Sequence, residues 1–219
     1  MLPRTSGRNL EIVALRENCV YLASRSPRRQ QLLSQIGVNF EVLSLREAPP
    51  RLADVDEKPL PAELPLDYTR RIARLKAEMG RLRLLERGLR DLPLLAADTV
   101  VVLGKRILGK PANCVRAKEM LKTLSGQTHQ VLTGIAVAAP SGVQVRVSTT
   151  MVQFRDMSER EIQAYVAHGE AQDKAGAYAI QGRAAVFVSA ISGSYSGVVG
   201  LPLYETGQLL EEFGISLFT

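Results

Sequence analysis

Apolar residues along the chain follow two spacings, and these spacings predict strands and helices in alternation. Short, almost continuous apolar runs are typical of buried strands, whereas apolar residues three or four positions apart form the buried face of a helix. The first pattern predicts strands at 20–23, 40–45, 92–103, 130–138 and 143–154. The second predicts helices at 26–37, 67–82, 113–124 and 158–166, with a last helix beginning at 202. The order of these elements predicts a mixed α/β fold.

Residues that favour helix ends support these boundaries. Ser26 is a good N-cap residue and is followed directly by a proline, which suits the first helical position. Asp67 is expected to cap the second helix and Asn113 the third. Ser158 and Glu161 have the spacing of a capping box, in which each side chain bonds the other's backbone N–H.

Two segments do not follow either spacing. Residues 1–18 have no clear apolar period, and we interpret them as an N-terminal extension of a single domain that covers 19–219. Residues 47–65, EAPPRLADVDEKPLPAELP, contain too many prolines and acids for regular structure. They predict a long loop, and long loops in compact domains are often functional.

Composition narrows the class of protein only a little. The 219 residues are 46% hydrophobic, which is ample for a buried core. The net charge of +6 favours an anionic partner, but it does not choose among a nucleotide, a nucleic acid and a membrane surface. No apolar run approaches the roughly 18 residues of a membrane span, and the polar first ten residues lack a signal-peptide core. We therefore expect a cytoplasmic protein.

Cysteine and histidine are rare in this chain. Cys19 and Cys114 stand far apart without the spacing of a zinc site, and we expect both to be core thiols. His129 and His168 show no partner pattern that would indicate a metal site or a catalytic triad.

The turn at 24–29 combines groups that suit a polyphosphate. Ser24, Arg28 and Arg29 lie where a strand passes into a helix, so hydroxyls, guanidiniums and free backbone N–H groups would meet there. The alternative is that Ser26 only caps the helix while the arginines face solvent. The turn is not a P-loop, because the chain has no GxxxxGK[ST] motif.

Asp98 lies within the apolar run LPLLAADTVVVL, where an unpaired charge would be costly. It therefore either makes a structural bond, binds a metal or acts as a base. Asp56 and Glu57 on the long loop could join it around a divalent cation such as Mg²⁺, or could simply be solvated acids.

Several other polar residues could contribute to an anion site. Lys76 and Lys110 could neutralise phosphate charge, although each could equally be a surface lysine. In the glycine-rich last third, Lys174, Tyr178 and Gln181 offer a cation, a ring and an amide for reading a base. A structural hairpin would explain the glycines of this region equally well.

Taken together and in order, these motifs resemble the Maf family over residues 20–212. The matching blocks are LASRSPRRQQLL at 22–33, VDE at 55–57, ARLKA at 73–77, AADT at 96–99, GKP at 109–111, LSGQTHQVLTG at 124–134, and DKAGAYAIQG at 173–182 followed by GSYSGVVGLPL at 193–203. The resemblance implies an α/β fold related to the inosine triphosphatase group, with an elongated sheet flanked by helices and a cleft between two lobes. It also implies a homodimer that hydrolyses a nucleoside triphosphate to the monophosphate and pyrophosphate with a divalent metal.

The resemblance assigns roles by position. Asp98 would be the proton acceptor that activates water, and Glu57 would hold the metal together with it. The phosphate path would be lined by Ser24, Arg29, Lys76, Lys110 and Lys174. Base preference would depend on Arg28, Thr99 and Gln181. The AGAYAIQG form is similar to that of the branch acting on dTTP and UTP, whereas the branch acting on 7-methyl-GTP differs there.

The chain departs from the family pattern at three places: an extra stretch at 45–53, Arg25 and Gly197. They bear on fine specificity and rate more than on the type of reaction. Two alternatives stay open: a pyrophosphatase for 7-methyl-GTP or other modified nucleotides, and a non-enzymatic septum-formation regulator that binds nucleic acid or a cell-division protein. Aromatic residues make up only 5% of the chain and no nucleic-acid module is present, so nucleic acid is the less favoured partner.

Overall fold

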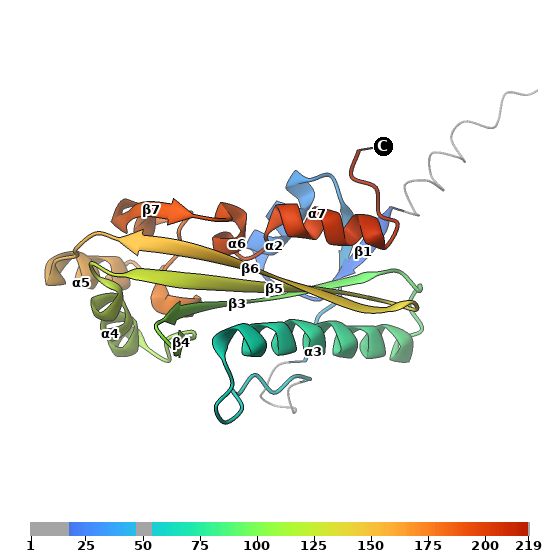
Figure 1. Ribbon diagram of the computed structural model, residues 1–219, viewed down its shortest axis with the longest axis horizontal. Coiled ribbons are helices and arrows are strands. Elements are labelled where there is room, and N and C mark those ends of the chain that lie inside the picture. The colour runs from blue at the N-terminus through green and yellow to red at the C-terminus, as the bar shows by residue number, and fades with distance from the viewer. Residues whose placement is uncertain (1–17, 47–53, 219) are drawn as a thin grey trace, which may run out of the picture.

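The computed structural model describes residues 18–46 and 54–218. Strands and helices alternate along most of this part of the chain (Figure 1). The strands are β1 (Cys19–Leu22), β2 (Asn39–Val42), β3 (Leu94–Leu103), β4 (Arg106–Leu108), β5 (Thr128–Ala139), β6 (Gly142–Phe154) and β7 (Val188–Ser192). The α-helices are α2 (Pro27–Gln35), α3 (Pro65–Glu86), α4 (Cys114–Leu124), α5 (Glu159–Ala167), α6 (Tyr195–Val199) and α7 (Leu203–Glu212). Two 3₁₀ helices, η1 (Ala175–Ala177) and η2 (Arg183–Phe187), lie in the glycine-rich last third.

All seven strands of the described chain belong to one mixed sheet in the order β2-β1-β3-β5-β6-β7, with β4 paired to β3. β1 runs parallel to β2 and β3, and the other pairings are antiparallel. β5 and β6 form one long hairpin that pairs from Thr128 with Gln153 to Ala139 with Gly142. The prediction of a mixed α/β fold around an elongated sheet is confirmed.

Helices cover both faces of the sheet. α3 lies along one face, while α2 and α7 lie on the other (Figure 1). Close approach of α3 depends on Gly134 of β5, because a Cβ added there would lie 2.7 Å from the carbonyl oxygen of Thr69. Ala73 and Ala77 of α3 are fully buried against the sheet. Small residues at this contact therefore set the position of the helix that carries Lys76.

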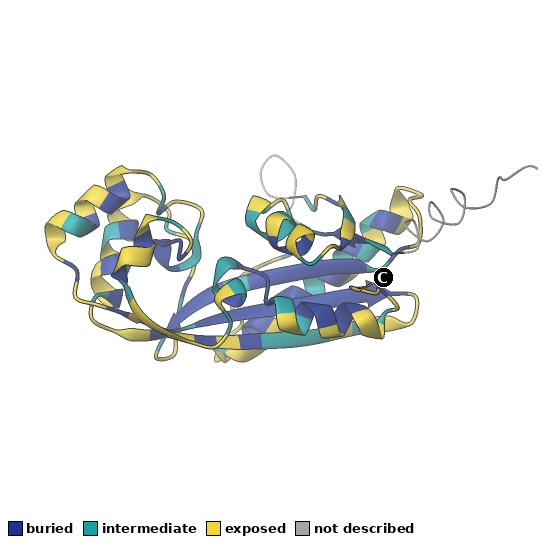
Figure 2. Cartoon of the chain, turned by 90° about the horizontal axis from the view of Figure 1, so that it is seen from above, coloured by how far each residue is buried: buried dark blue, intermediate teal, exposed yellow. Residues whose placement is uncertain are grey.

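One end of the molecule forms a separate lobe. α4 and α5 gather there around the ends of β5 and β6, apart from α2 and α7 (Figure 2). A hydrophobic cluster of its own fills this lobe and includes Leu121, Phe154, Tyr165 and Phe187. The expected arrangement of two lobes joined by one elongated sheet is therefore present.

Most predicted boundaries agree with the structure, and Asp67 is one exception. The Asn113 side chain accepts the backbone N–H of Arg116, and the capping box of Ser158 is formed. Asp67 does not cap α3, because the helix already begins at the preceding proline, Pro65. Asp67 lies in the first turn, where a carboxylate is favoured by the helix dipole.

Three further expectations were wrong or incomplete. Cys114 is exposed at the start of α4 and Cys19 is half-buried, so the prediction of two core thiols was wrong. Ser26 takes the N-cap position of α2, but its side chain makes no capping bond. The strand predicted at 40–45 ends at Val42. The predicted extension, apart from residue 18, and most of the extra stretch at 45–53 lie outside the described residues.

Candidate active site

A cleft of about 1310 Å³ opens on the described part of the chain. It is lined by the turn after β1, the loop before α3, the middle of β3, the segment after β4, residues 173–181 and the end of α6. All ten residues that the sequence assigned to a site line it: Ser24, Arg28, Arg29, Glu57, Lys76, Asp98, Thr99, Lys110, Lys174 and Gln181. Residues separated by up to 157 positions in the chain therefore meet in one cavity.

The ammonium of Lys76 lies between two carboxylates in this cleft. Its Nζ is 2.7 Å from Asp98 Oδ1 and 2.7 Å from Glu57 Oε1. Burial disfavours the charged lysine, but the charges of Asp98 and Glu57 and their hydrogen bonds outweigh burial and raise the pKa of Lys76. Lys76 is therefore a permanent cation that holds both acids together.

Strand β3 explains why Asp98 can be buried. Asp98 pairs with Gly134 of β5 and is only 7% exposed. Its charge is compensated by Lys76, which reaches it from α3. The structure thus provides the ionic partner that the apolar run around Asp98 required. Asp56 also lines the cleft, but its carboxylate accepts the backbone N–H of Lys58 at 3.0 Å and so stabilises the loop.

Arg29 of α2 is the central cation of the other cleft wall. Its guanidinium donates to the carbonyl oxygen of Gly200 at 2.8 Å, to the Ser24 hydroxyl at 3.3 Å and to the Thr99 hydroxyl at 3.2 Å. Burial lowers the pKa of Arg29, Asp98 opposes this effect and Arg28 adds to it. Three predicted site residues, Arg29, Ser24 and Thr99, are thus joined directly. Part of the hydrogen-bonding capacity of the guanidinium is used within the protein.

Thr133 of β5 completes this network, and sequence reasoning missed it. Its hydroxyl is buried, 3.0 Å from the Thr99 hydroxyl and 2.7 Å from the carbonyl oxygen of Gly197. The register of β3 and β5 places Thr99 directly opposite Thr133. The only signal in the sequence is its place in the LSGQTHQVLTG block, which does not indicate a partner.

The loop that carries Glu57 is tied to α3 near Glu57 itself. The Tyr68 hydroxyl donates to the backbone carbonyl oxygen of Glu57 at 2.9 Å. Arg71 donates to the carbonyl oxygen of Lys58 at 3.1 Å and forms an ion pair with Glu63 at 2.6 Å. These contacts hold Glu57 beside Lys76.

A second tie fixes the same loop further along α3. Arg83 forms an ion pair with Asp54 at 2.6 Å, and Arg46 pairs with the same carboxylate at 3.0 Å. The Asp54 side chain is only 1% exposed. Two arginines of α3, Arg71 and Arg83, therefore bind acids of the loop. The sequence gives no spacing from which these pairs could be read.

The far wall of the cleft depends on a buried aromatic contact. Tyr178 lines the cleft, and its hydroxyl lies 2.9 Å from Nε2 of His129. Burial lowers the pKa of His129 to about 4 and raises that of Tyr178 above its usual range. His129 therefore does have a partner, although the sequence showed no pattern for one.

Two of the carboxylates that line the cleft, those of Glu57 and Asp98, lie close enough together to serve a divalent metal. Among the described residues no group of three or more His, Cys, Asp or Glu side chains could hold a metal ion. Glu57 and Asp98 already converge on one cation, the ammonium of Lys76. This donor set fits an ion such as Mg²⁺, which is often held by one or two carboxylates with substrate phosphates and water completing its shell.

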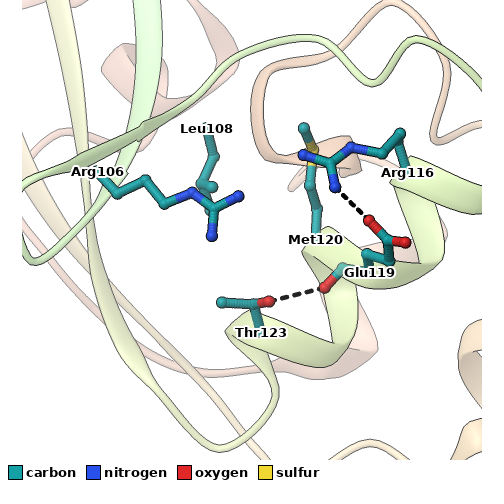
Figure 3. Close-up of a pocket in the computed structure, with 6 residues that line it drawn as sticks. All are labelled: Arg106, Leu108, Arg116, Glu119, Met120 and Thr123. Atoms are coloured by element: carbon teal, nitrogen blue, oxygen red, sulfur yellow. Dashed lines mark hydrogen bonds and ion pairs between the residues drawn. The ribbon is translucent and has the colours of Figure 1, made fainter.

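The second cavity is small and lies between β4 and α4 (Figure 3). Its volume is about 120 Å³, and Arg116 and Glu119 on its rim form an ion pair with each other. The Thr123 hydroxyl also has a partner within the protein, since it donates to the carbonyl oxygen of Glu119 at 2.8 Å. A cavity of this size cannot enclose a nucleotide, so the large cleft is the candidate active site.

Fold and cleft together define a class: an α/β protein with a cation-rich cleft built around a buried, lysine-paired carboxylate. The family model described as "Maf-like protein" matches residues 19–213, and the chain belongs to this family. No helix in the described part of the chain is both long and apolar enough to cross a membrane.

Relatives in the family are similar over almost their whole length. A protein of Nitrosospira multiformis named "dTTP/UTP pyrophosphatase" is 65% identical over 92% of this chain and 98% of its own. One of Nitrosomonas europaea with the same name is 62% identical over 92% of this chain and 97% of its own. Among solved structures, the Ham1 protein of Staphylococcus aureus matches 63% of this chain and 72% of its own at 18% identity, with a TM-score of 0.42.

Proposed function

We propose that the protein is a nucleoside triphosphate pyrophosphatase that hydrolyses dTTP and UTP to the nucleoside monophosphate and pyrophosphate. The observation that carries this proposal is the largely buried ion pair of Asp98 and Lys76, joined by the more exposed Glu57, inside a cleft with an excess of cations. Eight lysines and arginines line the cleft against four aspartates and glutamates. The names of the close relatives support the same activity.

Asp98 is the proposed general base. Its Oδ1 is bound to Lys76, which leaves the other carboxylate oxygen to accept a proton from water that attacks the α-phosphorus. The negative charge that develops on the leaving pyrophosphate would be stabilised by Arg29, Lys110 and Lys174, which line the same cleft. In this proposal, Asp98 accepts the proton and the three cations bind the phosphates.

Glu57 and Asp98 would hold the divalent metal. When bound, such an ion polarises phosphate oxygens and partly neutralises their charge. Lys76 contacts both carboxylates and so keeps them oriented toward one point. The Tyr68 hydroxyl supports this arrangement, because it fixes the backbone of Glu57.

Base preference is assigned to Arg28, Thr99 and Gln181. A glutamine amide can both donate and accept, and so matches the adjacent carbonyl and N–H groups of thymine and uracil. Cytosine presents an amino group and a bare ring nitrogen at the same edge. A site that bonds the thymine or uracil edge should therefore discriminate against CTP.

The test is a substrate panel with purified protein and Mg²⁺ or Mn²⁺. We expect dTTP and UTP to yield monophosphate and pyrophosphate, with CTP, GTP and 7-methyl-GTP cleaved more slowly, and we expect a chelator to stop the reaction. Asp98→Asn should lose at least about a hundredfold in kcat. A panel with no turnover, or an Asn variant as fast as the parent, would contradict the proposal. Preferential cleavage of 7-methyl-GTP would favour the alternative branch.

Two further parts of the proposal are a homodimer, which the resemblance to the family implies, and a cytoplasmic location, which the sequence led us to expect. Sedimentation of the purified protein at several concentrations tests the first, and cell fractionation tests the second. Tight binding of duplex DNA at physiological salt, without nucleotide turnover, would instead favour the regulator.

A further inference from the structure

Residues 174–181 form a wall of the cleft in an unusual backbone conformation. The segment carries Lys174 and Gln181, two residues to which the proposed function gives roles. Gly176 has φ of 68° and Ala177 has φ of 62°, so two consecutive residues are left-handed. This conformation is disfavoured for Ala177, which has a Cβ and is fully buried. The segment therefore needs contacts from outside to keep its shape.

Three hydrogen bonds supply those contacts. The backbone N–H of Gly176 donates to the carbonyl oxygen of Gly109 at 3.1 Å, beside Lys110. The backbone N–H of Ala179 donates to the hydroxyl of Tyr165 at 3.2 Å. The hydroxyl of Tyr178 lies 2.9 Å from His129. Each contact comes from a different element: the stretch after β4, helix α5 and strand β5.

His129 is a buried, uncharged hydrogen-bond partner for Tyr178. The side chain is 1% exposed and lies edge-on to Phe154 and Tyr178, with ring centroids 4.9 and 5.5 Å away. Burial keeps the pKa of His129 near 4, so its ring is neutral at pH 7 and has one acceptor nitrogen. Tyr178 keeps its proton because burial raises its pKa. The hydrogen bond between the Tyr178 hydroxyl and Nε2 of His129 therefore joins two uncharged groups at pH 7.

We propose that His129 and Tyr165 are positioning residues that hold residues 174–181 in shape and thereby set the discrimination between pyrimidine bases. Tyr165 bonds Ala179, two positions before Gln181, and His129 bonds Tyr178, three positions before it. This inference rests on the proposed function, since it gives the Gln181 amide the task of reading thymine or uracil.

The hydrolytic group is held independently. Asp98 is on β3, Glu57 on the loop before α3 and Lys76 on α3. The contacts that join them to one another and to Tyr68 do not involve His129 or Tyr165. Loss of either positioning bond should therefore change the KM for the preferred base and leave kcat nearly unchanged. A general loss of folding would lower both activity and stability without changing base preference.

The experiment compares Tyr178→Phe, Tyr165→Phe and His129→Leu with the parent. Two quantities are measured: the ratio of kcat/KM for dTTP to that for CTP, and amide hydrogen exchange of residues 174–181. We expect the ratio to fall about tenfold through KM, with kcat within about twofold, and exchange of the segment to rise at least about tenfold. His129→Gln, which keeps an acceptor, should restore part of both. His168→Leu, at the exposed histidine after α5, should change neither.

Unchanged exchange in all three variants overturns the inference, and so does faster exchange with an unchanged base ratio. Failure of the proposed function is recognised separately, because it would appear in the parent as absence of dTTP and UTP cleavage. Exchange would then still decide whether His129 and Tyr165 hold the segment.

Discussion

The ammonium of Lys76 lies 2.7 Å from a carboxylate oxygen of Asp98, and this ion pair joins helix α3 to the centre of strand β3. Both side chains are largely buried, with exposed fractions of 16% and 11%. A buried carboxylate of this kind needs a partner, and Lys76 serves Asp98 and Glu57 at once. The position of α3 on the sheet and the chemistry of the cleft are therefore coupled.

The first prediction concerns Lys76→Met. Two carboxylates would then face each other without the cation between them, and we expect kcat/KM for dTTP to fall by about a hundredfold. Lys76→Arg should keep part of the activity because it keeps the charge. Lys122→Met is the matched control, since Lys122 pairs with Glu159 at the same 2.7 Å but both side chains are exposed. Steady-state kinetics of the three variants measure kcat/KM for dTTP. Equal losses of kcat/KM in Lys76→Met and Lys122→Met would refute the prediction.

The second prediction concerns stability at acid pH. His129 titrates near pH 4 in the folded protein and near pH 6.5 when unfolded, so the unfolded state binds more protons between these values. The contribution of neutral His129 to the free energy of unfolding should therefore be fully present above about pH 7. It should fall as the pH drops through 6.5, and the loss should level off below pH 4. Between pH 7.5 and 5 the loss is about 2 kcal/mol.

Urea unfolding at the two pH values measures this loss. The His129→Gln variant lacks the titrating group. Between pH 7.5 and 5 its free energy of unfolding should therefore fall by about 2 kcal/mol less than that of the parent. An equal pH dependence in parent and variant would show that His129 is not responsible.

The third prediction concerns the loop that carries Glu57. Arg83→Met removes one of the two cations that compensate the buried Asp54. We expect a loss of about 3 kcal/mol in the free energy of unfolding, together with faster proteolysis of the loop. Arg70→Met on the same helix is the control, because the pair of Arg70 with Asp67 is exposed and should contribute only about 0–1 kcal/mol. Similar stability of the two variants would show that the ion pair of Arg83 with Asp54 does not hold the loop.

The fourth prediction concerns the contact of α3 with the sheet. In Gly134→Ala the new methyl group would lie 2.7 Å from the carbonyl oxygen of Thr69, and backbone cannot move aside as a flexible side chain can. We expect a loss of about 1–3 kcal/mol. Gly109→Ala, where a Cβ meets no atom within 4 Å, should cost little. Thermal unfolding of both variants provides the measurement, and an unaltered Gly134→Ala melting temperature would disprove the close approach.

Much of the fold could be predicted because its signals are local. The apolar spacing, the N-cap at Asn113 and the capping box at Ser158 depend on residues within a few positions of each other, and the structure has these elements in the predicted order. The mistaken cap at Asp67 is also informative. An acidic residue is favourable throughout the first turn, so composition alone does not distinguish the cap from the third helical position.

The ordered motifs assigned ten residues to a single site, although these residues are far apart in the chain. All ten line one cleft, although the local surroundings of Lys76 and Lys110 were equally typical of surface lysines. What motif matching could not provide was the partner of each residue. It placed Arg29 on the phosphates, whereas the structure also shows this guanidinium bound to Ser24, Thr99 and the backbone of Gly200.

The sequence by itself determined the order of strands and helices, the family, and ten of the residues that line the cleft. Tertiary structure alone decided that Lys76 bridges Asp98 and Glu57, that Tyr178 meets His129, and that Cys114 stays exposed. The physical reason is distance along the chain. Helix periods and caps are set by neighbouring residues, whereas a hydrogen bond or ion pair between residues far apart in the chain exists only after packing has fixed the geometry of both partners.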